Sequence, residues 1–418
     1  MTFLELKPTA LRLLMVGASI ALTSAAFAAP AQLLAPSAQD LAGGQAVRVA
    51  SPALELAPEQ RGAVTYSFPV AADARVAPAP TPFLAESHEF FVEVSAETLR
   101  RGTPLHLTAP GAVVRVHPVG PLLSAAVDST EFVLTSEVGR FAAGTGMETL
   151  ADADAMAEAG VPFAAGTVAF RVAPEVGVGA VILSAPDLRA RGTYQVHVFE
   201  PQSRIVLTLQ TAKVDYLHGE ELEVAATLRD GRTGFAASAI EAYVTSPAGR
   251  AWTLPLNAEG AGRYVGTLRL DAVEAAAPGL WEVHTAARGR VGGLEVARSE
   301  RTSFGAHVPT ATLSNQVDVT QARGRVEVGF EVAVATPSRF EVRALLYGTD
   351  ARGQLRPIAS GHAADLLETD GTLRLVFDRE LIAASGLEAP FELRDLRLVD
   401  YGRLATLHRQ AVALRIAD

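Results

Sequence analysis

Short runs of alternating apolar and polar residues recur along most of the chain. Val64, Tyr66 and Phe68 would share one face of a strand, and residues 326–332 alternate just as strictly. Successive side chains of a β-strand point to opposite faces, so this period of two predicts strands with one buried face. The runs follow one another at intervals of about 10–15 residues, with glycine and proline between them, which is typical of β-sandwiches.

One segment departs from this pattern. Residues 146–160 place Met147, Leu150 and Met156 among alanines and acids, and Gly160 with Pro162 would end a helix there. We therefore expect one short helix, inserted in the first domain.

A turn residue followed by a large aromatic and, two positions later, by a β-type residue occurs three times at domain-sized spacing. A late strand of an immunoglobulin-like sandwich begins in this way, and antibody domains place a cysteine at the inward position. This chain has no cysteine, so apolar residues would close each core instead. The three pairs are Tyr194 with Val196, Trp281 with Val283, and Phe391 with Leu393.

These copies predict three domains in an all-β fold of tandem β-sandwiches, with one short helix in the first. We expect an N-terminal sandwich-like domain with the helical insertion at residues 45–202. An immunoglobulin-like domain of seven strands would follow at 203–308, and a C-terminal sandwich at 309–418. Residues 29–44 show no period and are expected to form a flexible N-terminus.

The first 28 residues have the pattern of a secretory signal peptide. Lys7 and Arg12 precede an apolar stretch at residues 13–22, and Ala26-Phe27-Ala28 is a small-residue cleavage motif. A bilayer span takes about 20 apolar residues, and no such stretch follows. We expect an exported protein, periplasmic or extracellular, without a transmembrane segment in the mature chain.

Composition narrows the classes of function. Hydrophobic residues make up 49% of the chain and charged residues 20%, which suits packed cores rather than general disorder. The absence of cysteine excludes thiol catalysis and thiolate metal sites. A formal net charge of −10 argues against non-specific binding to nucleic acid.

Candidate catalytic and metal residues are few. His106 and His117 fall on different predicted strands, whereas His197 and His284 both stand three positions after the motif aromatic, which indicates an architectural position. The sequence has no His-x-His or His-Glu-x-x-His, no Gly-x-Ser-x-Gly elbow in the mature chain, and no phosphate-binding loop. It therefore predicts no catalytic, cofactor-binding or metal residue.

Two charged groups leave alternatives open. Aspartates crowd the turns of the third domain, where oxygen-rich loops can bind calcium, although aspartate is also a common turn residue. Four arginines flank a glycine hairpin in the second domain, either as a patch for an anionic glycan or, as we favour, as a solvated edge that discourages strand pairing. The aspartates are Asp350, Asp365, Asp370, Asp378, Asp395 and Asp400, and the arginines are Arg288, Arg290, Arg298 and Arg301.

Several segments together resemble a known family. Residues 162–170, 192–199, 246–250 and 278–283 are similar to an uncharacterised family of exported bacterial proteins. The resemblance implies an N-terminal β domain, a middle immunoglobulin-like domain and a C-terminal β domain over nearly the whole mature chain. It implies no activity and no catalytic residue.

The sequence favours a non-catalytic, exported binding protein whose partner is a protein or a glycan. Sandwiches present loops at their ends and strand edges along their sides, and both suit such contacts. Two alternatives remain open. One is a secreted enzyme or enzyme accessory with a site in the first domain, where the helix interrupts the sandwich pattern. The other is a calcium-dependent carbohydrate-binding module in the third domain.

Overall fold

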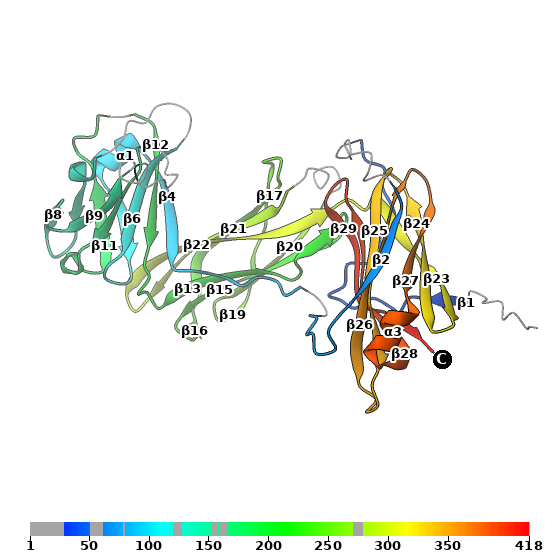
Figure 1. The fold of residues 1–418 in the computed structure, drawn as a ribbon. Coiled ribbons are helices and arrows are strands. Elements are labelled where there is room, and N and C mark those ends of the chain that lie inside the picture. The colour runs from blue at the N-terminus through cyan, green and yellow to red at the C-terminus, as the bar shows by residue number, and fades with distance from the viewer. Residues whose placement is uncertain are drawn as a thin grey trace, which may run out of the picture.

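Three β-sandwiches follow one another in an extended row (Figure 1). The computed structural model describes residues 29–50, 62–77, 80–119, 128–152, 158, 166–189, 191–270 and 279–417. The all-β prediction is confirmed. The predicted signal peptide lies outside the described residues, and among the described ones no helix is long and apolar enough to cross a membrane.

The first domain packs a sheet of order β4-β12-β6-β10-β9 against a sheet of order β5-β11-β7-β8. Tyr194 and Val196 are buried between the two sheets, as the repeated motif predicts. The sheet strands are β4 (Glu89–Ser95), β5 (Thr103–Leu107), β6 (Val113–Val119), β7 (Val133–Thr135), β8 (Arg140–Ala142), β9 (Met147–Asp152), β10 (Val168–Val172), β11 (Gly179–Ser184) and β12 (Thr193–Phe199). The 3-10 helices are η2 (Ser129–Glu131) and η3 (Pro174–Val176).

The first part of the helix predicted over residues 146–160 is a strand instead. Residues Met147–Asp152 form strand β9, paired with β10, and Leu150 points into solvent rather than onto a helix face. Pairing with β10 satisfies the backbone there, so tertiary contacts override the local helical pattern. The rest of the predicted segment lies outside the described residues, apart from Glu158, which is helical. A short helix that the sequence does not predict is α1 (Ala96–Arg101), which begins where Ser95 accepts a hydrogen bond from the backbone of Thr98.

The second domain has the strand order of an immunoglobulin-like sandwich. One sheet runs β19-β20-β15-β13-β3 and the other β14-β22-β21-β17-β18, which matches the ABED and CFG sheets of that fold. All seven predicted strands are present. Their bounds, with the short additions, are β13 (Ile205–Thr211), β14 (Asp215–Leu217), β15 (Glu221–Asp230), β16 (Thr233–Gly234), β17 (Ala237–Thr245), β18 (Ala251–Thr253), β19 (Asn257–Gly260), β20 (Arg263–Arg269), β21 (Trp281–Val291) and β22 (Leu294–His307).

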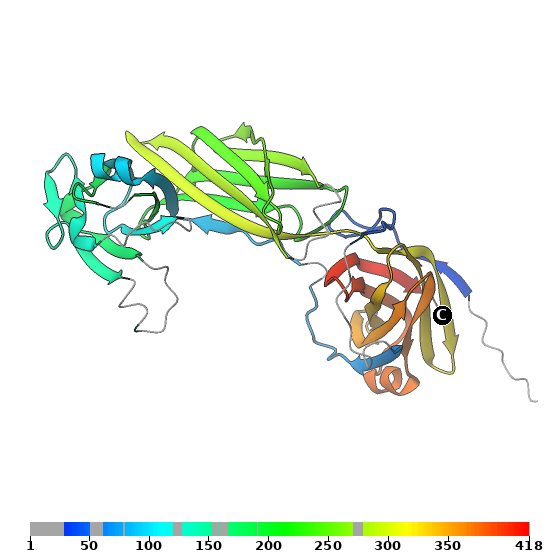
Figure 2. The ribbon, with the colours of Figure 1, turned by 90° about the horizontal axis from the view of Figure 1, so that it is seen from above.

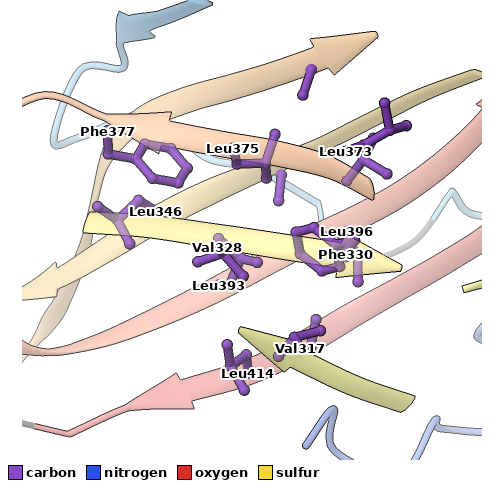
Figure 3. Packing of buried hydrophobic residues seen from close by; sticks show 14 of the residues in the cluster. Val317, Val328, Phe330, Leu346, Leu373, Leu375, Phe377, Leu393, Leu396 and Leu414 are labelled. Atoms are coloured by element: carbon purple, nitrogen blue, oxygen red, sulfur yellow. The ribbon is translucent and has the colours of Figure 1, made fainter. Parts of the chain in front are cut away.

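The third domain packs a sheet of order β1-β23-β24-β27 on a sheet of order β2-β26-β25-β28-β29. Figure 3 shows the apolar side chains that fill the space between them, among them Phe330, Phe377 and Leu393. Its C-terminal elements are β23 (Ala311–Ala322), β24 (Arg325–Val334), β25 (Ser338–Thr349), β26 (Leu355–Leu367), β27 (Gly371–Phe377), α3 (Arg379–Ser385), β28 (Glu388–Asp400) and β29 (Ala405–Ile416).

The N-terminal residues complete the third domain, which corrects two predictions. Strand β1 (Ala29–Gln32) pairs with β23, and Leu41, fully buried, exchanges backbone hydrogen bonds with Arg409, so residues 29–44 are not a flexible tail. Strand β2 (Val64–Pro69) pairs with β26 and therefore does not belong to the first domain.

The chain therefore runs out along the molecule and back. After the third domain it adds β3 (Ala85–Ser87) to the second domain, builds the first domain, and returns through the second to the third. Figure 2 shows the dark-blue strand β1 beside the olive strand β23, and the lighter-blue strand β2 beside the orange elements of the same domain.

Candidate binding surface at the junction of the first two domains

A buried ion pair joins the first domain to the second. Arg298 on β22 lies 2.8 Å from Glu200, the residue after β12, and both side chains are 0% exposed. Glu200 also accepts from the backbone N–H of Thr108, and Arg298 donates to the carbonyl of Ile205 and to the hydroxyl of Ser203. Because further hydrogen bonds satisfy both charges, the pair can persist in a buried site and hold the two domains in one arrangement.

The outward sheet face of the first domain carries an aromatic–histidine–arginine row beside this junction. Phe91, His197 and Arg115 stand directly across from one another on β4, β12 and β6. The rings of Phe91 and His197 stack with centroids 4.5 Å apart, and His197 Nε2 lies 2.7 Å from a carboxylate oxygen of Glu89. This hydrogen bond lowers the pKa of Glu89.

The second domain carries the same kind of row. Tyr243, His284 and Arg301 stand across from one another on β17, β21 and β22, and the rings of Tyr243 and His284 stack at 4.6 Å. Arg301 contributes to the lowered pKa of Glu89 in the first domain. Burial is the main cause of the lowered pKa of His284, and Arg301 lowers it further against the opposing effect of Glu282. Glu89, which contacts His197 of the first row, and Arg301 of the second row line the same groove, so the two rows border one surface at the junction.

A groove of about 310 Å³ opens on this surface. Phe83 and Phe199 supply apolar walls, and Glu89, Glu300 and Arg301 supply charge. Phe83 is 74% exposed. Burial raises the pKa of Glu300, and the nearby Glu89 carboxylate raises it further. The groove thus offers apolar contact next to Glu300, a carboxylate whose negative charge is disfavoured by burial and by Glu89.

A third row lies on the outward sheet face of the third domain. Tyr66, His362 and Arg343 stand across from one another on β2, β26 and β25. The rings of Tyr66 and His362 stack at 4.9 Å, and His362 contacts Glu341. Each of the three domains therefore presents an aromatic residue, a histidine bonded to a glutamate, and an arginine on one sheet face.

His197 and His284 stand out in the sequence, but the rows they belong to do not. The two histidines could be placed at equivalent positions because that needs only the order of residues. The neighbours Phe91, Tyr243 and Arg115 come from other strands, and strand register is not readable from the sequence. His106 and His117 lie on β5 and β6, in different sheets. Within the described residues no three His, Cys, Asp or Glu side chains are grouped to hold a metal.

The six aspartates are not brought together. Asp350 accepts backbone hydrogen bonds within its own hairpin, Asp370 accepts one from Val334, and Asp395 pairs with Arg397. Asp400 is fully buried and accepts from the hydroxyls of Thr310 and Ser338. Asp378 precedes α3 and pairs with Arg325, and Asp365 bonds the next backbone N–H. These carboxylates serve local structure, so the arrangement does not support the calcium alternative.

The predicted solvated arginine edge is wrong for one member. Arg288, Arg290 and Arg301 are exposed, but Arg298 is the buried junction residue. Its strand, β22, packs against β4 and β5 of the first domain, and its side chain contacts Glu200 rather than water. The burial depends on the packing of two domains, which local sequence does not reveal.

Comparisons with known proteins agree with the fold. Family models for the domain of unknown function DUF4785 match residues 55–200 with the N-terminal domain, 203–307 with the central domain and 310–417 with the C-terminal domain. A crystal structure of a DUF4785 family protein from Legionella pneumophila is 22% identical, covers 90% of this chain and 99% of that chain, and has a TM-score of 0.69. No curated protein matches the sequence.

Other solved structures are only distantly similar. Escherichia coli alpha-2-macroglobulin is 14% identical with a TM-score of 0.28, over 73% of this chain and 20% of that chain. The Yersinia pseudotuberculosis adhesin InvE is 13% identical with a TM-score of 0.21, over 52% of this chain and 61% of that chain. Likeness at this level carries no argument about function.

Proposed function

Because the chain belongs to the uncharacterised DUF4785 family, its own surface has to indicate its function, and we propose that it is an exported, multidomain protein-binding protein. Export rests on the signal-peptide pattern of residues 1–28, which favours a periplasmic or extracellular location. The proposed binding site is the groove at the junction of the first two domains.

The observation that carries this proposal is the exposed aromatic cluster at the junction of the first two domains. Phe83 and Phe199 line the groove, and Phe91 lies on the same face beside them. All three rings remain exposed, although burying a phenylalanine stabilises a protein by about 1.5–3 kcal/mol. Exposed aromatic side chains next to arginine are the composition of protein-binding hot spots.

The charge of the groove favours a basic partner. Glu300 has a raised pKa because burial and Glu89 disfavour its charge, and a cation placed between the two carboxylates would relieve this. We therefore expect a protein segment that presents an apolar side chain beside a lysine or arginine. Its binding would weaken as salt screens the charges.

The two alternatives from the sequence have less support. The first part of the helical insertion that made the first domain a candidate for catalysis is instead strand β9 over Met147–Asp152. The aspartates that suggested calcium lie apart.

A photo-crosslinking amino acid at position 83 tests the proposal. The full chain would be produced in its source cells with the crosslinker at position 83 or, as a matched control, at Val138, another exposed apolar position in the first-domain half of the chain. We expect a discrete protein adduct at 83 and none at 138. Glu300→Lys, which repels a basic partner, should abolish the adduct without lowering the melting temperature.

Two outcomes would contradict protein binding. Equal adducts at positions 83 and 138 would mean that the groove has no preference. An adduct that contains only glycan would identify the wrong class of partner.

A further inference from the structure

We propose that the third domain carries a second, chemical site, in which Ser360, His362 and Glu341 form an acyl-transfer triad that hydrolyses carboxylic esters. The site lies on the outward sheet face, on the row of Tyr66, His362 and Arg343. It is independent of the junction groove.

The triad arises from strand alternation. Ser360 and His362 are two residues apart on β26 and so project from the same face, while Glu341 stands on the neighbouring strand β25. Ser360 Oγ lies 3.0 Å from His362 Nε2, and His362 Nδ1 lies 2.5 Å from Glu341 Oε1. These distances place the nucleophile and the base within hydrogen-bond reach and give the base an orienting carboxylate.

The hydrogen bonds fix the tautomer of His362. The side chain of Glu341 is only 5% exposed, and its other oxygen accepts from the Tyr401 hydroxyl at 2.5 Å. Burial and the bond to Glu341 raise the pKa of Tyr401 to about 12, so it stays a donor. An ionised carboxylate only accepts, so His362 donates through Nδ1, and Nε2 keeps its lone pair toward Ser360.

Neighbouring side chains orient the imidazole of His362 and place a positive charge next to it. Tyr66 stacks on His362 with the ring planes 1° apart, and Phe68 stacks on its ring at 5.5 Å. Arg343 stands directly across from His362 on β25. A positive charge at this place would stabilise the oxyanion that forms when the serine attacks a carbonyl.

The other two rows show what is special about the third. In the first domain Nε2 of His197 is already hydrogen-bonded to the carboxylate of Glu89. In the second domain Thr245 and Glu282 both approach Nε2 of His284, at 3.2 Å and 3.3 Å. In the third domain the carboxylate and the hydroxyl take opposite nitrogens of His362, which is what general-base activation requires.

The reaction balances with water as the only co-reactant. Ser360 Oγ bonds to the ester carbonyl carbon as its proton passes to His362 Nε2, and the carbon–oxygen bond to the alcohol breaks as that proton moves to the leaving oxygen. Water then attacks the acyl-serine, gives a proton to Nε2, and the serine recovers it. Because the serine lies on an open sheet face, the fitting substrate is a short acyl ester borne on a larger molecule.

Covalent labelling of the folded chain of residues 29–418 by a fluorophosphonate probe tests the triad. Peptide mapping should find one adduct, on Ser360, and 4-nitrophenyl acetate should be hydrolysed at a rate that rises with pH as the general base loses its proton. Ser360→Ala should remove both signals. Thr245→Ala, which removes the hydroxyl of the second row, should leave both unchanged.

Glu341→Gln and His362→Gln distinguish a role in activating Ser360 from a role in stabilising the fold. Each should slow labelling of Ser360, by up to about 10⁴-fold for the carboxylate, in protein whose circular dichroism is unchanged. If either variant fails to fold, the pH dependence of labelling in the unaltered chain decides. No adduct on Ser360 under conditions that label a known serine esterase would overturn the proposal, as would labelling that does not depend on pH.

Discussion

At the scale of single residues, the lowered pKa of Glu89 makes the stability of the fold depend on pH. The hydrogen bond from His197 is the main cause of the lowered pKa of Glu89, and Arg115 and Arg301 act in the same direction. A carboxyl whose folded-state pKa lies below its unfolded value of 4.5 stabilises the fold above that value. This stabilisation is lost as the pH falls through the lowered pKa.

We predict that Glu89→Gln lowers the melting temperature slightly at neutral pH, and that the two proteins converge as the pH falls below 4.5. The effect is small because both side chains are partly exposed and such pairs contribute about 0–1 kcal/mol. Thermal unfolding between about pH 3 and pH 7 measures it. In a His197→Gln background the difference should shrink; a difference of constant size across this range would rule out the linkage.

At the scale of elements, the third sandwich depends on strands from the start of the chain. Leu41 is fully buried against this domain, whereas Leu404 in the same domain is 72% exposed. The two leucines therefore form a matched pair for measuring how firmly the N-terminal segment is attached.

We predict that Leu41→Ala lowers the free energy of unfolding of the third domain by about 2–5 kcal/mol, because it leaves a cavity. Leu404→Ala should change it by less than about 0.5 kcal/mol. Denaturant unfolding followed by hydrogen exchange in β23 and β29 reports on this domain. Equal effects of the two changes would mean that residues 29–44 are loosely held after all.

Strands could be predicted where the alternation of apolar and polar residues within a short stretch of sequence is enough to identify them. The alternation of residues 326–332 and the seven strands of the second domain are properties of short windows, and β24 and the second-domain sandwich contain them. The partner of Tyr66 and Phe68 is β26, far along the chain, so their strand could be predicted but not its domain. The junction groove and the triad depend on register and domain packing, and neither leaves a local signal.

At the scale of the whole molecule, Arg298 and Glu200 decide whether the first two domains move as one body. Removing one partner of a buried ion pair leaves an uncompensated charge and costs about 3–5 kcal/mol. The exposed pair of Arg101 and Glu97 on α1 provides a contrast within the first domain.

We predict that Glu200→Gln loosens the junction, which small-angle X-ray scattering would detect as a broader distribution of overall dimensions, and lowers the first unfolding transition. Glu97→Gln, at an exposed pair, should change neither measurable property appreciably. Replacing both junction residues with apolar ones, as in Arg298→Met with Glu200→Leu, should restore only part of the lost stability, because the backbone N–H of Thr108 then loses its acceptor. A rigid scattering profile for Glu200→Gln would show that apolar packing alone holds the domains.

The out-and-back path of the chain sets an order of folding. Strands β1 and β2 are synthesised first, but their partners β23 and β26 come only after the first two domains. Contacts between such distant segments are slow to form because a long loop must close. If the chain is exported N-terminus first, β1 and β2 cross the membrane before β23 and β26. They then stay unpaired until the first and second domains have been exported. The last domain then closes over strands that arrived first, so a truncated chain would leave the edges of β1 and β2 open to pairing with other molecules.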